Sequence, residues 1–247
     1  MTISALIIAR NEQDKIEKTL LSLDFADEIV VILDRSIDNT KKICRKFTRN
    51  IFEGSWRCEG RRRNYGIKKC KSEWIFEIDA DEVISNDLSK EIISKKNDSF
   101  DFYYIPLLNY VSNKPVHFGW MACLAPDGKF CMFKKKSKHW DKGLVHPNYQ
   151  LAGEKGPSFK NSIDHYMSEN LSQLIDRFNR NSSLYSIELK EKDAQLSKLF
   201  SIRKIFSRFI KCYLTRKGYK SGGIGILVSI LIALYPYVSA LKSTNNN

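Results

Sequence analysis

The chain has 247 residues, of which 43% are hydrophobic and 12% aromatic, and its formal net charge is +13. This length and apolar content suffice for one large domain, or a domain with an appendage, and exclude disorder as the default. The positive charge predicts an anionic partner, which is nucleic acid, a phospholipid surface or a phosphorylated substrate. Six scattered cysteines without Cys-x-x-Cys spacing, and an N-terminus that begins directly in an apolar run without a leader, indicate a reduced, cytosol-facing protein.

The first fifty residues alternate between strand and helix patterns. Residues 2–9 form an apolar run that predicts a strand, residues 14–23 have helical spacing, residues 28–33 predict a second strand, and residues 40–47 a second helix. Such alternation predicts parallel strands joined by right-handed crossovers. This is a Rossmann-like architecture, in which ligands bind at the carboxyl edge of the sheet.

Three adjacent arginines open the next predicted helix, at residues 60–71, which follows a short strand at residues 50–52. A charge run on a helix forms either a solvated face or, at the helix N-terminus, a set of guanidinium groups that contact phosphate. Both interpretations stay open on this segment alone.

An apolar strand at residues 74–78 ends abruptly in Asp79-Ala80-Asp81-Glu82. In an extended chain, residues two apart project to the same side, so Asp79 and Asp81 can share one divalent cation. A metal held there would grip a pyrophosphate. The alternative for an isolated Asp-x-Asp (DXD) motif is an ordinary polar turn whose acids face water. Further along, residues 88–93 predict a helix and residues 100–108 an aromatic strand.

Four segments in this order resemble the family 2 glycosyltransferases of the GT-A fold. They are IIARNE at residues 7–12, VILDRSIDNT at 31–40, GRRRNYGI at 60–67 and IDADE at 78–82. Later groups are similar to those of the bacterial lipopolysaccharide core glycosyltransferases, namely Gly119-Trp120, Pro126-Asp127, Phe133-Lys134-Lys135, Val145-His146 and His165-Tyr166. The resemblance implies an α/β GT-A fold, Rossmann-like, with a mostly parallel sheet flanked by helices. The catalytic domain is expected at residues 1–170, with a nucleotide-binding part at 1–100 and an acceptor part at 101–170.

The family implies transfer of a sugar from a nucleoside-diphosphate donor to a hydroxyl acceptor, usually with inversion. A divalent metal, Mg²⁺ or Mn²⁺, stabilises the charge on the departing diphosphate. By resemblance, Asp81 is the metal ligand, and Asp79 lies against the ribose or the water shell of the metal. Arg61 and Arg62 are expected on the solvent side. Residues expected to contact the donor nucleotide or its phosphates are Ala9, Arg10, Glu12, Asp34, Arg63, Asn64 and Asp79.

Two aspartates of the second predicted strand end have alternative roles. Asp34 can accept a hydrogen bond from a uracil-type N–H, or it can form a turn. For Asp38 we favour a helix cap, because Asp before Thr40 suits the start of a helix.

An inverting transferase needs a group that takes the proton of the acceptor hydroxyl. Asp127, in the Pro-Asp pair of the subgroup, is the expected base, with Asp141 and Glu154 as fallbacks, and an ordinary Pro-Asp-Gly turn is the alternative. Where many relatives follow Val-His with an acid, this chain has Pro147, so the role of that acid is absent or met elsewhere. Expected contacts to acceptor or diphosphate are Glu82, His146 and His165, although a lone histidine is more often structural.

The C-terminal part, residues 171–247, is predicted to be a helical extension that associates with membranes. Residues 198–220 combine eight cations with apolar positions at helical spacing, which is typical of a basic helix on an anionic bilayer. A helix packed on the catalytic domain with a solvated basic side is the alternative. Residues 221–241 carry no charge and are long enough to cross a bilayer, but three glycines and Pro236 favour a hairpin or a shallow insertion.

The sequence therefore predicts an inverting, metal-dependent glycosyltransferase, peripheral on the inner face of the cytoplasmic membrane. A UDP-sugar is the favoured donor, and the expected acceptor is a lipopolysaccharide-core or lipid-linked saccharide. One alternative is a basic nucleic-acid-binding protein, which explains neither the acidic turn nor the neutral apolar run, so no nucleic acid is expected as a partner. Another is a GT-A-fold binding protein without activity. A lysine in the place of the ion between the two aspartates would contradict the enzymatic interpretation.

Overall fold

The computed structural model describes residues 1–144, 147–191 and 196–245, and the chain divides into two compact units. Unit 1 comprises Met1–Leu107, Gly128–Gly143 and Pro147–His165. Unit 2 joins residues 108–127 to the C-terminal helices. These units do not follow the predicted division at residue 170, because Val111, Val116 and Trp120 pack in one core with residues of the C-terminal helices.

The large sheet is mixed, and four parallel strands form its N-terminal half. Their order is β3-β2-β1-β4, and they comprise β1 (Ile3–Ala9), β2 (Glu28–Asp34), β3 (Ile51–Gly54) and β4 (Trp74–Asp79). The sheet continues in the order β8-β6-β11-β5 with β8 (Gly128–Lys134), β6 (Phe102–Val111), β11 (Ile163–Ser168) and β5 (Glu82–Val83). The pairs β4–β8, β6–β8 and β5–β11 are antiparallel. The parallel half and its alternation with helices agree with the sequence prediction, whereas these three pairs differ from the parallel pattern.

Three shorter strands complete the set. In unit 2, β7 (Lys114–Val116) pairs with the end of β6, and in unit 1, β9 (Lys138–Trp140) and β10 (Tyr149–Leu151) form a small antiparallel sheet. The first residue of β9, Lys138, is buried.

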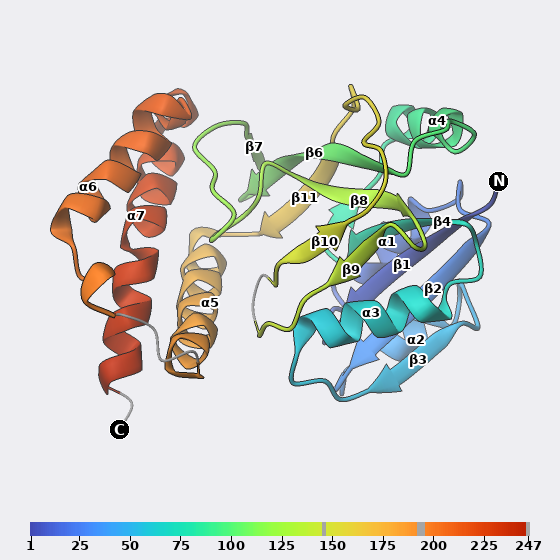
Figure 1. Ribbon diagram of the computed structural model, residues 1–247, viewed down its shortest axis with the longest axis horizontal. Helices are drawn as coiled ribbons and strands as arrows, with labels where there is room; N and C mark the ends of the chain where they lie inside the picture. The colour runs from blue at the N-terminus through green and yellow to red at the C-terminus, as the bar shows by residue number, and fades with distance from the viewer. Residues whose placement is uncertain (145–146, 192–195, 246–247) are drawn as a thin grey trace. The chain divides into compact units, whose positions relative to one another are not determined.

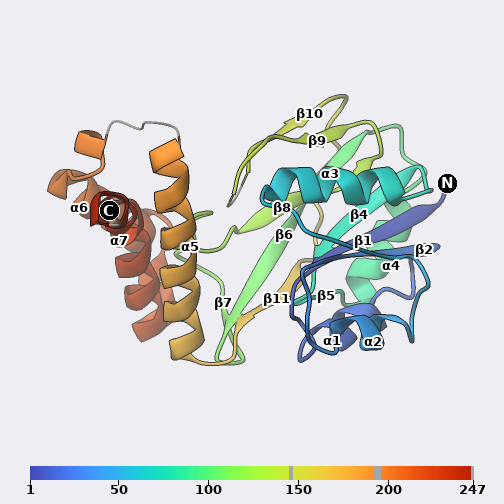
Figure 2. The same cartoon turned by 90° about the horizontal axis from the view of Figure 1, so that it is seen from below.

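Helices cover both faces of the parallel half of the sheet (Figures 1 and 2). One face packs on α1 (Ile16–Leu21), α2 (Thr40–Cys44) and α4 (Asn86–Lys95), and the opposite face packs on α3 (Glu59–Lys69). Alternate residues of β1 belong to the two cores, with Ile7 on the first face and Leu6 on the second. Burial on both faces explains why β1 is a continuous apolar run. Gly66 lets α3 approach the sheet, since a Cβ there would lie 2.7 Å from Leu6 Cδ1.

The described residues of unit 2 include the α-helices α5 (Leu171–Glu191), α6 (Ile202–Ile210) and α7 (Gly222–Asn245). Short turns of other helical types occur at Leu196–Lys198, Lys211–Thr215 and Gly218–Ser221. The core of the unit is formed by Val228 and Ile232 of α7 with Leu174 of α5 and other buried side chains.

Of the two predicted forms of residues 221–241, a hairpin or a shallow insertion, the hairpin is wrong, because α7 is one continuous helix through Pro236. Packing of α7 against α5 and α6 overrides the poor helix propensity of its residues. Gly222 and Gly223 lie in its first turn, and Gly225 is required by close approach, since a Cβ there would lie 1.9 Å from the carbonyl oxygen of Gly218. By length and composition alone Gly218–Asn245 could cross a membrane, but half of its most apolar stretch is buried inside the protein.

Candidate active site

The acidic turn lies where β4 ends, at the carboxyl edge of the parallel strands. Along β4, Ile75 faces the α3 side of the sheet and Phe76 the other, so alternation puts Glu77 and Asp79 on the side of α3. The turn at Ala80 and Asp81 then leads into β5. The Thr19 hydroxyl of α1 donates to the Ala80 carbonyl at 2.8 Å, which anchors the turn to the core.

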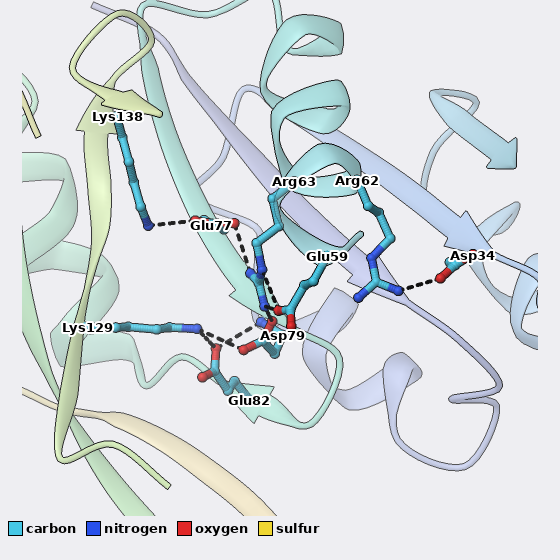
Figure 3. A network of polar contacts seen from close by, with 9 residues as sticks. All are labelled: Asp34, Glu59, Arg62, Arg63, Glu77, Asp79, Glu82, Lys129 and Lys138. Carbon is cyan, nitrogen blue, oxygen red and sulfur yellow. Dashed lines mark hydrogen bonds and ion pairs between the residues drawn. The ribbon is translucent and has the colours of Figure 1, made fainter. Parts of the chain in front are cut away.

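Two cations hold Asp79 and Glu82 (Figure 3). Lys129 Nζ of β8 donates to Glu82 Oε2 at 2.5 Å and to Asp79 Oδ2 at 3.4 Å. Arg63 Nη2 of α3 donates to Asp79 Oδ1 at 3.2 Å, and the Asp79 amide donates to Glu82 Oε2 at 2.9 Å. A lysine therefore lies beside Asp79, close to the arrangement that was expected to contradict the enzymatic interpretation. Its carboxylate partners are Asp79 and Glu82. Glu82 is fully buried, so it holds Lys129 and the Asp79 amide in place rather than lining the surface of the site.

Asp81 lies beside His165 instead. The Asp81 Oδ2 and His165 Nε2 atoms are 3.5 Å apart, and both side chains are largely buried. The antiparallel register of β11 and β5 sets this approach, because His165 pairs with Glu82, the neighbour of Asp81. The predicted contact of His165 with acceptor or diphosphate stays a prediction, and the structure places its ring beside Asp81.

A second part of the network lies deeper on the same side of β4 (Figure 3). Glu77 accepts hydrogen bonds from Arg63 Nη1 and from Lys138 Nζ, both at 2.9 Å. Arg63 Nε also donates to Glu59 Oε1 at 2.9 Å. The ammonium of Lys138 lies 4.0 Å from the ring centroid of Trp140. One arginine thus links three carboxylates and fixes the position of Asp79.

Burial and these cations shift the pKa values in opposite directions. Burial favours the neutral form of Asp79, but Lys129 and Arg63 outweigh it and hold the pKa of Asp79 below its usual range. For Glu77, Lys138 and Arg63 likewise outweigh burial and lower the pKa. For Glu82, burial outweighs Lys129, and the pKa is raised. Asp79 and Glu77 are therefore anionic at neutral pH.

The formal charge of the cluster is negative. Five carboxylates, those of Glu59, Glu77, Asp79, Asp81 and Glu82, face three cations, those of Arg63, Lys129 and Lys138. The carboxylates therefore outnumber the cationic side chains by two. Among the residues that the structure describes, no group of three or more His, Cys, Asp or Glu side chains forms a metal cage. Asp81 and His165 suit a cation that takes its other ligands from phosphate oxygens and water, as Mg²⁺ commonly does.

Asp34 is buried at the end of β2, and Figure 3 shows Arg62 pointing toward it. Its oxygens accept from Arg35 Nε at 2.9 Å, from Arg62 Nη1 at 2.7 Å and from the Trp56 amide at 3.2 Å. Burial raises its pKa, but the bonds from Arg35 and Trp56 and the charge of Arg62 outweigh it and lower the pKa. The expectation that Arg62 lies on the solvent side is wrong, because Asp34 attracts it inward, whereas Arg61 is exposed as predicted.

The first strand end positions the remaining residues of the predicted donor wall. Ala9 is buried at the end of β1 and Arg10 is exposed beside it. The Glu12 amide donates to Thr40 Oγ1 at 2.9 Å. The Asp38 carboxylate accepts the Thr40 amide at 3.1 Å just before α2, whose N-cap residue is Asn39.

The Asn64 side chain forms hydrogen bonds with the backbone of Trp140. Its side-chain amide donates to the Trp140 carbonyl at 2.8 Å, and its carbonyl oxygen accepts the Trp140 amide at 3.0 Å. The side chain thereby joins α3 to β9, so its predicted contact with the donor competes with this pair of bonds.

The residues considered for proton transfer lie in different parts of the chain. Asp127, in unit 2, is exposed and accepts a hydrogen bond from Arg216 Nη1 at 2.9 Å. In unit 1, Asp141 accepts from Gln150 and Glu154 is exposed. His146 lies outside the described residues.

Sequence reasoning missed Glu59, Lys129 and Lys138 as members of this network. The available signal was Glu77 itself, an acid inside an otherwise apolar strand, which requires buried cationic partners. Arg63 of α3 and Lys138 of β9 supply them, and this packing of distant segments is not visible in local sequence.

The fold and the site together define the class of protein to which this chain belongs. Parallel strands with crossover helices, an acidic turn at their carboxyl edge and buried arginines beside it form an α/β protein that binds a phosphate-bearing ligand at that edge. A family model described as Glycosyl transferase family 2 matches residues 4–145. This match covers more than half of the chain, and the chain belongs to glycosyl transferase family 2. The protein is accordingly a glycosyltransferase that transfers a sugar from a nucleotide-sugar.

Individual relatives are similar over nearly the whole length. An uncharacterised glycosyltransferase of Rickettsia conorii is 26% identical over 98% of this chain and 92% of its own. The lipopolysaccharide core biosynthesis glycosyltransferase LpsC of Rhizobium meliloti is 22% identical over the same shares. The crystal structure of S. aureus TarS 1-349 in complex with UDP-GlcNAc superposes with a TM-score of 0.50 at 12% identity, covering 99% of this chain and 91% of that one. The last likeness supports the fold alone.

Proposed function

We propose that the enzyme is an inverting, divalent-metal-dependent transferase that uses a UDP-sugar and glycosylates a lipopolysaccharide-core or lipid-linked saccharide. The observation that carries the metal assignment is the approach of Asp81 to His165 at the edge of β4. Asp79 and Glu82 are neutralised by Arg63 and Lys129, whereas Asp81 lies beside an imidazole. The residual negative charge of the cluster favours a cation there.

Asp81 and His165 would hold the metal ion, Mg²⁺ or Mn²⁺. When bound, it would neutralise charge that develops on the nucleoside diphosphate as the sugar leaves. Lys129 would hold Glu82 and Asp79 in place and keep them from competing for the ion. Asp79, fixed by Arg63, would present its carboxylate to the ribose of the donor. Arg62 would hold Asp34 at the base-binding end of the site.

Asp127 is proposed as the group that accepts the proton of the acceptor hydroxyl. Arg216 donates to its Oδ2, which orients the carboxylate. A carboxylate held in this way acts as a base only if the acceptor hydroxyl reaches it directly. The prediction that follows is a loss of turnover, with donor binding unchanged, when the carboxylate becomes an amide.

Two observations support the proposed acceptor and the proposed membrane location. LpsC of Rhizobium meliloti is named for lipopolysaccharide core biosynthesis, and its similarity extends over almost the whole chain. The cations of residues 198–220 suit an anionic membrane surface, where such acceptors are held. The proposed location is therefore the inner face of the cytoplasmic membrane.

Release of UDP from several UDP-sugars is the test, with a lipopolysaccharide-core saccharide as acceptor and with Mn²⁺ or chelator. We expect Mn²⁺-dependent release and an inverted anomeric configuration in the product by NMR. Asp127→Asn should lower kcat at least about a hundredfold, and Asp141→Asn should leave it unchanged. Full activity in chelator would refute the metal dependence, and full activity of Asp127→Asn would refute the base.

A further inference from the structure

The most amphipathic helix of unit 2 carries an apolar stripe that nothing in the described chain covers. Ile202, Phe206, Ile210 and Leu214 are 66%, 64%, 50% and 56% exposed. They recur every four residues, so they lie along one side of α6 and the turn that follows it. A contiguous exposed apolar patch of this kind marks an interaction surface rather than ordinary surface.

The residues next to this stripe are cationic. Arg203 and Lys211 are exposed on α6 and its following turn, and Lys217 and Lys220 are exposed just beyond. Tyr219, 48% exposed, adds an aromatic ring between the last two. No acidic residue follows Asp193 in the sequence. The stripe is thus bordered by one sign of charge, which complements an anionic partner.

The longer apolar helix, α7, is engaged inside the unit. Val228 and Ile232 lie in the core, and the Tyr235 hydroxyl donates to the Asn181 carbonyl of α5 at 3.1 Å. Lys242 Nζ donates to the Asn179 carbonyl at 2.9 Å and to two serine hydroxyls of α5. A helix tied to a polar neighbour by such bonds is a core helix of the unit and cannot leave α5 without losing them.

We propose that the exposed face of α6, and not α7, docks the enzyme on an anionic bilayer. Ile202, Phe206, Ile210 and Leu214 enter the boundary between headgroups and acyl chains, while the flanking lysines and arginine contact lipid phosphates. This inference rests on the proposed membrane location and specifies which surface produces it. The helix lies in the plane of the membrane, and α7 stays packed inside unit 2 rather than spanning it.

The test is sedimentation of the full-length protein with vesicles of phosphatidylcholine, with and without phosphatidylglycerol. Phe206→Ser/Ile210→Ser removes two apolar anchors from α6. Its matched control is Ile226→Ser/Ile230→Ser, which removes two side chains of α7 that are 43% and 41% exposed. We expect the α6 variant to lower the partition coefficient roughly tenfold per side chain, and the control to change it less than about twofold. Arg203→Gln/Lys211→Gln should cost about fivefold per cation, and only on anionic vesicles.

Each other outcome overturns the inference in a distinct way. Equal losses in the α6 and α7 variants would show that α7 inserts, and unchanged binding of the α6 variant would remove α6 from the interface. If the wild type is a dimer by sedimentation velocity and the α6 variant is a monomer that still binds vesicles, the stripe joins two copies of the chain. Wild-type protein that binds no vesicle would refute both this surface and the membrane location. Release of UDP with a water-soluble acceptor should be the same in all variants, so these results leave the transfer reaction separately testable.

Discussion

Glu77 offers a quantitative test of the buried network. Glu77→Gln keeps the shape of the side chain but removes the charge that faces Arg63 and Lys138, each 2.9 Å away. Both the Glu77 and Lys138 side chains are only 2% exposed, so water cannot replace the lost partner. Breaking a buried pair in this way costs about 3–5 kcal/mol. For a chain of this size, that corresponds to a fall of roughly 10 °C in the melting temperature.

Thermal and urea unfolding of three variants test this reasoning. Glu77→Gln/Lys138→Met should recover much of the stability, because the second substitution removes the unpaired ammonium and fills its volume. Glu53→Gln, which breaks the exposed pair with Lys41, should cost less than about 1 kcal/mol. Burial lowers the pKa of Lys138, so in Glu77→Gln the unfolded state binds more protons, and the loss of stability should shrink as pH rises above 7. A Glu77→Gln variant as stable as Glu53→Gln would refute the buried ion pair.

Three further predictions follow from individual contacts. Folding lowers the pKa values of Glu77 and Asp79, so the stability that these carboxylates contribute is complete above their unfolded values of about 4 and is lost as pH falls. The urea midpoint of unfolding should therefore fall between pH 7 and pH 3. A midpoint that does not change with pH would contradict the lowered pKa values. Asn64→Ala should destabilise the folded protein by about 1–3 kcal/mol, because it removes two hydrogen bonds to the Trp140 backbone. If the variant instead keeps its stability and binds UDP tenfold more weakly, the donor contact predicted from sequence would be restored. Gly60→Ala should lower the melting temperature strongly, because a Cβ there would lie 1.8 Å from the Asp141 carbonyl oxygen. The control Gly223→Ala would place its Cβ more than 4 Å from the nearest atoms, so it should be neutral or stabilising by up to about 1 kcal/mol.

The parallel half of the sheet was predictable because its physical signals are local. Strands buried on both faces are continuous apolar runs, and β1 and β4 are such runs, each followed by polar residues at the carboxyl edge. The acidic turn was therefore identified with its strand. Arg63 was assigned to the site only through the family resemblance, and the structure explains its position by three carboxylate partners.

The remaining features depended on contacts between distant segments. Lys129 reaches Asp79 across fifty residues of chain through the pairing of β8 with β4, and no local pattern records that pairing. Propensity rules failed for α7 because its glycines and Pro236 are outweighed by packing on α5 and α6. Arg62 was misplaced because a charge run does not show which of its members meets a buried acid.

Binding of UDP measured by isothermal titration, with and without Mn²⁺, tests the central claim most directly. In the wild type, Mn²⁺ should strengthen UDP binding, because Asp81 and His165 would hold the ion against the diphosphate. Asp81→Asn should abolish this enhancement while leaving binding without metal unchanged. Asp81→Asn protein that binds UDP and Mn²⁺ as tightly as the wild type would contradict the assignment.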